Sequence, residues 1–188
     1  MKQIALIFAL SLWALSASAQ TISASGQIGW IIPGGSGVNE ENYDVGGGLN
    51  IAVDALYHLG DEGKLGVGIG YYTGILAGGL LDAFGMRVIG VKGLYELKSE
   101  GFTPYFGLTI GAASLETPET SINGMVVSES SSATGLGLVP QIGIKFGGGF
   151  YIAGDYVVPT NFDIEEIMAT GSVGGLIISL GYRYKFNF

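Results

Sequence analysis

Cysteine is absent from the 188-residue sequence, which excludes a disulfide framework, a lipoprotein anchor and a thiolate metal site. Basic residues are also few, with eight Lys and Arg against sixteen Asp and Glu. An acidic chain of this kind is a poor partner for nucleic acid. After the N-terminal segment no run of eighteen apolar residues occurs, so the sequence predicts no transmembrane helix there.

The first nineteen residues have the pattern of a secretory signal peptide. Met1-Lys2 is a short positive region, residues 4–15 form an apolar region too short to span a bilayer, and Ala17-Ser18-Ala19 is an A-x-A cleavage site. We expect residues 1–19 to be removed and residues 20–188 to form one domain. The mature domain then holds seven basic residues against sixteen acidic ones, and the leader predicts export.

The C-terminal residues alternate without a break between an apolar face and a polar one. Leu176, Ile178, Leu180, Tyr182, Tyr184, Phe186 and Phe188 share the first face, and Ile177, Ser179, Gly181, Arg183, Lys185 and Asn187 share the second. The aromatics gather at one end of the apolar face, as in the interfacial girdle of a membrane barrel. The pattern predicts a strand with one lipid-facing side.

Seven more segments of the mature chain show the same period of two. We expect eight strands, at Thr21–Ile32, Asp44–Leu59, Leu65–Tyr72, Ile89–Leu97, Tyr105–Ala112, Leu136–Phe146, Tyr151–Val158 and Leu176–Phe188. Eight is the smallest number of strands at which a membrane barrel closes. The predicted fold class is all-β, an eight-stranded antiparallel up-and-down transmembrane β-barrel.

The connections between these segments alternate in length. Gly60–Gly63, Lys98–Gly101 and Gly147–Gly149 are short, whereas Pro33–Tyr43, Gly74–Gly85, Leu115–Ser132 and Pro159–Gly171 are long. Transmembrane barrels place short turns in the periplasm and long loops outside the cell. A chain that starts in the periplasm would sort its connections in this way, whereas a soluble barrel has no reason to do so.

Polar residues on the inward faces are expected to form a network in the lumen. Its members are Asp54, Lys92, Glu96, Gln141, Lys145, Asp155, Arg183 and Lys185. Four of the charges are basic and three acidic, which favours mutual pairing because unpaired buried charge is costly. Asp155 and Arg183, on neighbouring strands and each about five residues from the strand end, are the predicted direct pair. A structural plug is favoured over an ion or proton path.

The long loops carry acidic and apolar residues. Ten acids lie there, as Glu40, Glu41, Asp44, Asp82, Glu116, Glu119, Glu129, Asp163, Glu165 and Glu166. They solvate the surface or capture a cation or basic ligand outside the cell, although their spacing matches no calcium loop. Arg87, at the outer interface, either contacts lipid phosphate or marks a frayed strand end. The apolar loop 74–85 packs over the barrel mouth, dips into lipid or covers a path for a hydrophobic ligand.

Enzymatic activity is not expected. The only histidine, His58, faces inward near a tight turn with no serine nearby in sequence, so it is interpreted as a polar lumen residue. No carboxylate pair has the spacing of a glycosidase or aspartic protease, and the glycine repeats precede no helix that would bind phosphate. The sequence predicts no catalytic residue, cofactor or metal.

The chain resembles small outer-membrane barrels of the OmpA, OmpX and OmpW type in its leader, its alternating strands, the sorting of its loops and its final Phe188. The resemblance implies a location in the outer membrane of a Gram-negative bacterium, with lipid and the barrel assembly machinery as partners, and a monomer. It also implies that Tyr182, Tyr184, Phe186 and Phe188 form the assembly signal. OmpX-like members suggest surface adhesion or envelope integrity, and OmpW-like members suggest passage of small hydrophobic molecules. The expected function is a non-enzymatic barrel with a closed lumen that serves envelope structure or surface contact. The alternative is a channel for hydrophobic compounds, and a remote alternative is a lipid-A-modifying barrel enzyme.

Overall fold

The computed structural model describes residues 21–34, 46–60, 63–77, 83–97, 101–117, 120–122, 125–128, 131–164 and 169–187. The strands in these ranges are β1 (Thr21–Gly34), β2 (Gly48–Leu59), β3 (Leu65–Ala77), β4 (Ala83–Glu96), β5 (Phe102–Thr117), β6 (Thr120–Ile122), β7 (Met125–Ser128), β8 (Ser131–Phe146), β9 (Phe150–Ile164) and β10 (Ala169–Asn187). The expected signal peptide lies outside the described residues.

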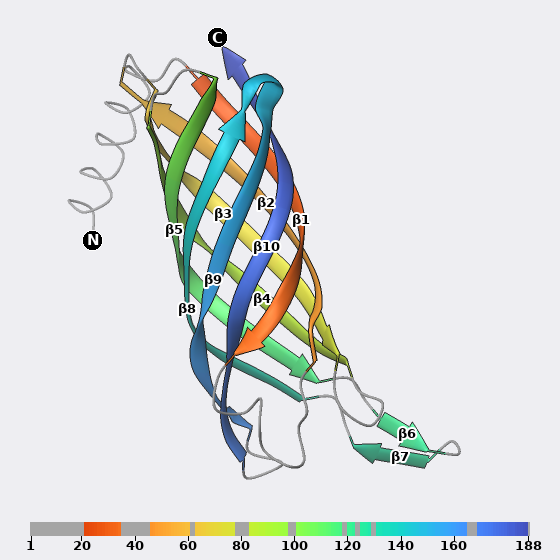
Figure 1. Ribbon diagram of the computed structural model, residues 1–188. Helices are drawn as coiled ribbons and strands as arrows, with labels where there is room; N and C mark the ends of the chain where they lie inside the picture. Colours follow the sequence, from red (N-terminus) through yellow and green to blue (C-terminus); the bar gives the residue numbers. More distant parts are fainter. Residues whose placement is uncertain are drawn as a thin grey trace, which may run out of the picture.

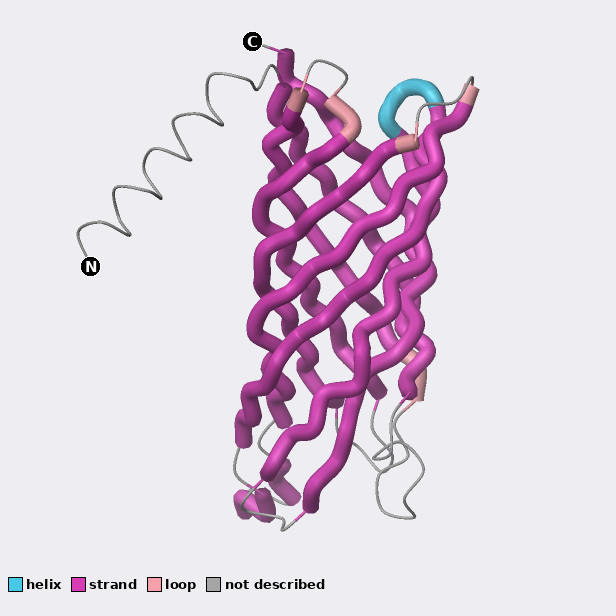
Figure 2. The backbone as a smooth tube through the Cα atoms, turned by 90° about the vertical axis from the view of Figure 1, so that its left-hand side faces the viewer, coloured by secondary structure: helices cyan, strands magenta, loops and turns pink. Residues whose placement is uncertain are grey.

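Eight of these strands form one closed barrel, in the order β1-β10-β9-β8-β5-β4-β3-β2. Every neighbouring pair is antiparallel, and β1 closes the ring on β10 from Thr21↔Asn187 to Gly34↔Gly174 (Figure 1). Closure pairs the backbone groups that an open sheet would leave at its edges. Figure 2 shows the strong tilt of the strands that closure at this small size requires. The predicted eight-stranded up-and-down barrel is confirmed.

The alternation read from the sequence separates the two faces of the barrel wall. Ile28, Ile69 and Leu180 point outward and are more than half exposed, whereas Gln27 and Ser179 point inward and are buried. The same alternation holds in all eight barrel strands over their described side chains. An outer face covered by large apolar side chains, with charged and polar residues buried inside, is the reverse of a water-soluble domain.

The strand ends that short connections join lie at one end of the barrel, and the strand ends that long connections join lie at the other (Figure 1). The start of β1 and the end of β10 lie at the short-turn end, called the turn end below; the opposite end is the loop end. Between β8 and β9 the chain reverses through the 3₁₀ turn η2 (Gly147–Gly149). Gly148 and Gly149 have φ of 85° and 93° there, which glycine adopts without strain. The predicted sorting of the connections is confirmed.

Three long connections are shorter than predicted because the strands continue beyond the apolar alternation. β3 extends to Ala77 and β4 begins at Ala83, so most of the expected loop 74–85 is strand. β9 and β10 likewise extend into the expected loop 159–171, and β6 and β7 occupy the loop 115–132. Backbone pairing does not require a lipid-facing side chain at every second position, so hairpins run past the point where that signal stops.

A row of four paired glycines crosses the inner side of strands β3, β4, β5 and β8. The register joins Gly70 to Gly90, Gly90 to Gly111 and Gly111 to Gly137. A Cβ atom on Gly111 would collide with the backbone carbonyl of Ile89, and one on Gly137 would lie 2.7 Å from Val88 Cγ1. At Gly90 and Gly111, in the middle of the row, neighbouring strands therefore approach too closely for any side chain.

Substituting Gly111 by Ala is expected to destabilise the barrel by about 1–3 kcal/mol, the usual cost of forcing a methyl group into a packed site. Gly93→Ala is the matched control, because an added Cβ there meets nothing within 4 Å. Reversible urea titration in lipid vesicles measures both. Equal unfolding midpoints for the two variants would contradict the close approach.

Candidate functional site

The interior of the barrel is the candidate site, and its loop half is filled by apolar side chains. The buried residues of this apolar cluster are Ile31, Ala52, Tyr72, Leu76, Met86, Val88, Ala113, Leu115, Ala133, Val139, Val157 and Ile177, with Phe84 and Val173 packed against them. Ile31, Leu76, Val88 and Ile177 are each 0% exposed, so no solvent reaches them. Leu76 and Phe84 belong to the expected apolar loop; the structure places both on strands, within and against the cluster.

Charged residues occupy the half of the lumen nearer the turns. Nζ of Lys92 on β4 lies 2.6 Å from Oδ2 of Asp54 on β2, and both side chains are almost fully buried. Nη2 of Arg183 on β10 lies 3.7 Å from the same Asp54 oxygen. Each of these three buried charges thus has an opposite charge beside it, which offsets part of the cost of removing it from water.

Glu96, at the end of β4, is shared by three cations from β8 and β10. Lys145 Nζ donates to Oε1 at 2.7 Å, Lys185 Nζ donates to Oε2 at 2.8 Å, and Arg183 Nη1 donates to Oε1 at 3.4 Å. These contacts join β4, β8 and β10 across the lumen. Together with the Asp54–Lys92 pair they form one ion cluster of four cations and two carboxylates, with a net charge of +2.

Asp155 lies apart from this ion cluster. Its carboxylate accepts hydrogen bonds from Gln27 Nε2 at 2.9 Å, Ser179 Oγ at 3.4 Å and Tyr72 OH at 3.5 Å. In the register Asp155 is opposite Ile177, six residues before Arg183, which is about 20 Å along a strand. The predicted direct pair between Asp155 and Arg183 is therefore wrong. Gln141, also expected in the network, donates to Gln27 Oε1 at 3.3 Å.

Two tyrosines flank the guanidinium of Arg183. Its Cζ lies 5.2 Å from the ring centroid of Tyr105 and 5.3 Å from that of Tyr151, and the rings meet edge to face. A cation over an aromatic face is attracted by the ring quadrupole, more strongly when both are desolvated. The two tyrosine rings therefore stabilise the Arg183 guanidinium in addition to its contacts with the carboxylates of Asp54 and Glu96.

His58 forms a contact that its sequence neighbourhood did not indicate. Its Nε2 lies 2.8 Å from Ser23 Oγ on β1, and its Nδ1 lies 2.9 Å from the carbonyl oxygen of Gly63. A serine beside a histidine is the geometry of an activated nucleophile. Ser23 is 0% exposed and His58 is 1% exposed, however, so no substrate reaches the hydroxyl. The contact satisfies two buried polar groups.

Other expected site residues lie on the outside or beyond the described residues. Arg87 is exposed on the outer face, and its Nη1 lies 2.6 Å from Glu116 Oε1, so this end of β4 is paired and not frayed. Tyr182, Tyr184 and Phe186 point outward near the turn end, with the rings of Tyr184 and Phe186 packed edge to face. Phe188 and most of the loop acids lie outside the described residues. In the described part of the chain no helix is long and apolar enough to cross a membrane.

Comparison with solved structures relates this architecture to known proteins. Neisserial surface protein A superposes with a TM-score of 0.62 at 15% identity, covering 88% of this chain and 97% of that one. The outer membrane protein OprG from Pseudomonas aeruginosa superposes with a TM-score of 0.54 at 13% identity, covering 91% and 98%. This chain has the fold of a small outer-membrane barrel. No protein-family model matches its sequence, and neither does any curated protein.

The division of the lumen of this outer-membrane barrel fold into an apolar half and a charged half was not predicted from the sequence. The predicted lumen network contained only polar residues, although Ile31, Val88, Val139 and Ile177 also lie at inward positions of their strands. Their place in the alternation could have predicted this, because apolar side chains at inward positions near the loop end indicate a segment of the lumen without water.

Proposed function

We propose that this chain is a non-enzymatic integral protein of the outer membrane of a Gram-negative bacterium, with a closed lumen, serving envelope structure or surface contact. Export by the N-terminal leader belongs to the proposal. The outer face supports the membrane location, because large apolar side chains cover it in every barrel strand. The fold shared with outer-membrane proteins supports it as well.

The proposal of a closed lumen rests on one observation, which is that side chains fill the interior of the barrel. In the loop half, side chains such as Leu76 and Ile177 are fully buried against one another. In the turn half, Glu96 ties together cations from β8 and β10 across the axis. An ion would have to break these pairs and then cross an apolar layer without its hydration shell, which is prohibitively costly.

Recordings in planar bilayers test the closed lumen. We expect wild-type protein to show no steady open-channel current, with or without small hydrophobic solutes in the bath, because the apolar cluster excludes water and ions. Different mobilities of unboiled and boiled samples on a detergent gel establish that the inserted protein is folded. A steady current from folded protein, or a current altered by hydrophobic solutes, would favour the channel for hydrophobic compounds instead.

A further inference from the structure

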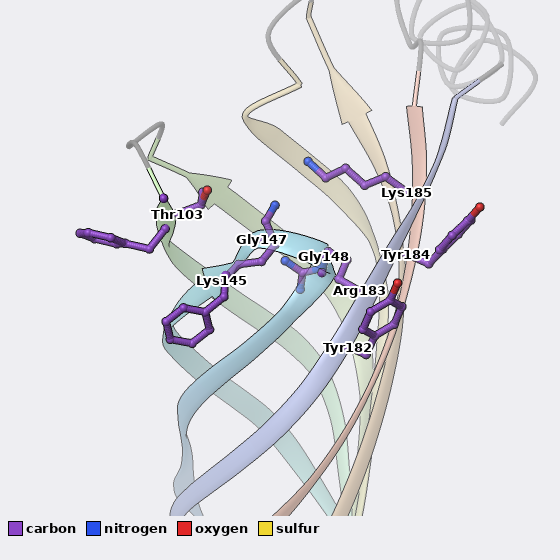
Figure 3. Close-up of a pocket in the computed structure, with 12 residues that line it drawn as sticks. Thr103, Lys145, Gly147, Gly148, Tyr182, Arg183, Tyr184 and Lys185 are labelled. Carbon is purple, nitrogen blue, oxygen red and sulfur yellow. The ribbon is translucent and has the colours of Figure 1, made fainter.

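The rim of the barrel is notched at the turn end, where β10 runs past the β8–β9 hairpin. The pairing of β10 with β9 ends at Tyr182↔Phe150, whereas its pairing with β1 continues to Thr21↔Asn187. The η2 turn therefore lies below the end of β10. A pocket of about 470 Å³ occupies this notch, bounded by η2, Thr103, Lys145 and residues 182–185 (Figure 3). We call it the rim pocket.

The inner wall of the rim pocket is cationic. Figure 3 shows Lys145, Arg183 and Lys185 extending to the lumen side, while Tyr182 and Tyr184 point away on the outer side of β10. The side chains of Lys145 and Lys185 are 15% and 32% exposed, so both are partly open to the medium while their ammonium groups donate to Glu96. Arg183 lies buried behind them, and its Nε and Nη2 donate to no protein acceptor. With the net charge of +2 in the ion cluster, the rim pocket is complementary to an anion.

The outer wall of the rim pocket is apolar and continues onto the lipid face. A groove of about 710 Å³ shares Phe146 and Tyr182 with the rim pocket and passes Phe150, Leu180 and Ile28 on the outside of the barrel. Tyr182 packs edge to face on Phe150, with ring centroids 5.0 Å apart, and so holds the border between pocket and groove. A ligand that fills both has a negative head and a hydrocarbon tail.

We propose that the rim pocket binds the headgroup phosphate of an anionic phospholipid from the leaflet at the turn end, with an acyl chain of the same lipid in the outer groove. Lys145 and Lys185 contact the phosphate oxygens, and Arg183 adds positive charge behind them. A free phosphate would use only the cationic wall, whereas the phospholipid also covers the apolar groove. The inference rests on the membrane location proposed above.

Native mass spectrometry of the folded protein in a neutral detergent tests this site, with phosphatidylglycerol, phosphatidylcholine and inorganic phosphate as separate probes. A lysine near an anionic lipid surface contributes about a fivefold change in affinity. We therefore expect Lys185→Gln to weaken phosphatidylglycerol binding about fivefold, and Lys145→Gln with Lys185→Gln to weaken it about 25-fold. Lys64→Gln is the matched control, because it removes the same charge at the turn end but does not line the rim pocket.

The outcomes separate this inference from the proposed function. Equal weakening by Lys64→Gln, or unchanged binding in Lys185→Gln and in the double variant, would overturn the lipid site. Inorganic phosphate binding as tightly as phosphatidylglycerol, or phosphatidylcholine doing so, would also overturn it, because the site would then not select an anionic lipid. The gel-mobility shift is read on every variant. A folded barrel that binds no phosphatidylglycerol refutes the site and leaves the closed-lumen function standing.

Discussion

Replacing Lys92 with methionine is expected to destabilise the folded protein by about 3–5 kcal/mol, the usual cost of removing one partner of a buried ion pair. Lys92 Nζ is 2.6 Å from Asp54 Oδ2, and the other cation near Asp54 is Arg183, 3.7 Å away. The variant leaves a carboxylate deep in the lumen without a hydrogen-bonded counter-charge. Urea titration in lipid vesicles measures the free energy of unfolding.

Adding Asp54→Asn to Lys92→Met should restore a substantial part of the lost stability, because a neutral amide is less costly to bury than an unpaired carboxylate. Lys185→Gln is a suitable control, since its side chain is the most exposed of the cluster. If Lys92→Met were no more destabilising than Lys185→Gln, the central position of the Lys92–Asp54 pair would be wrong.

Ile69→Arg is expected to destabilise by about 2–4 kcal/mol, because it places a charge on the lipid face near the middle of the bilayer. Ile69 is 65% exposed on the outside of β3 and stands opposite Ala55 and Val91 in the register. In a water-soluble barrel the same substitution at such an exposed position would be nearly neutral.

Leu65→Arg supplies the depth control for this experiment. Leu65 lies on the same face of the same strand but at its turn end, where an arginine reaches the interface and costs about 0–1 kcal/mol. The difference between the two variants, measured by the same titration in vesicles, reports the depth of Ile69. Equal costs at both positions would contradict the orientation of β3 in the membrane.

The fold was predictable from sequence because each barrel strand has different solvents on its two faces. In β10, Leu180 and Tyr182 face outward while Ser179 and Arg183 face inward, and this contrast is visible as a period of two without any structure. The topology was predictable from the lengths of the connections, since a hairpin turn as short as Gly147–Gly149 permits only adjacent antiparallel strands.

The pairing inside the lumen was not predictable to the same extent, because it depends on strand stagger. Counting from strand ends placed Asp155 and Arg183 at one height, yet the register separates them by six residues. Shear around a closed barrel shifts each strand relative to its neighbour, and a single sequence contains no direct record of that shift. For the same reason the contact between Ser23 and His58, which are 35 residues apart in the chain, was not predicted.

Because the two halves of the lumen differ, the two ends of the barrel give different access to the ion cluster. At the turn end the ion cluster is partly exposed through Lys145 and Lys185. Toward the loop end, the fully buried side chains of Ile31, Leu76 and Ile177 fill the lumen. With the lumen closed as proposed, we expect protons and salt to exchange with Glu96 from one compartment alone. In vesicles with a single orientation, acid or salt in that compartment reaches the bonds that hold β4, β8 and β10 together, and the same change in the opposite compartment does not.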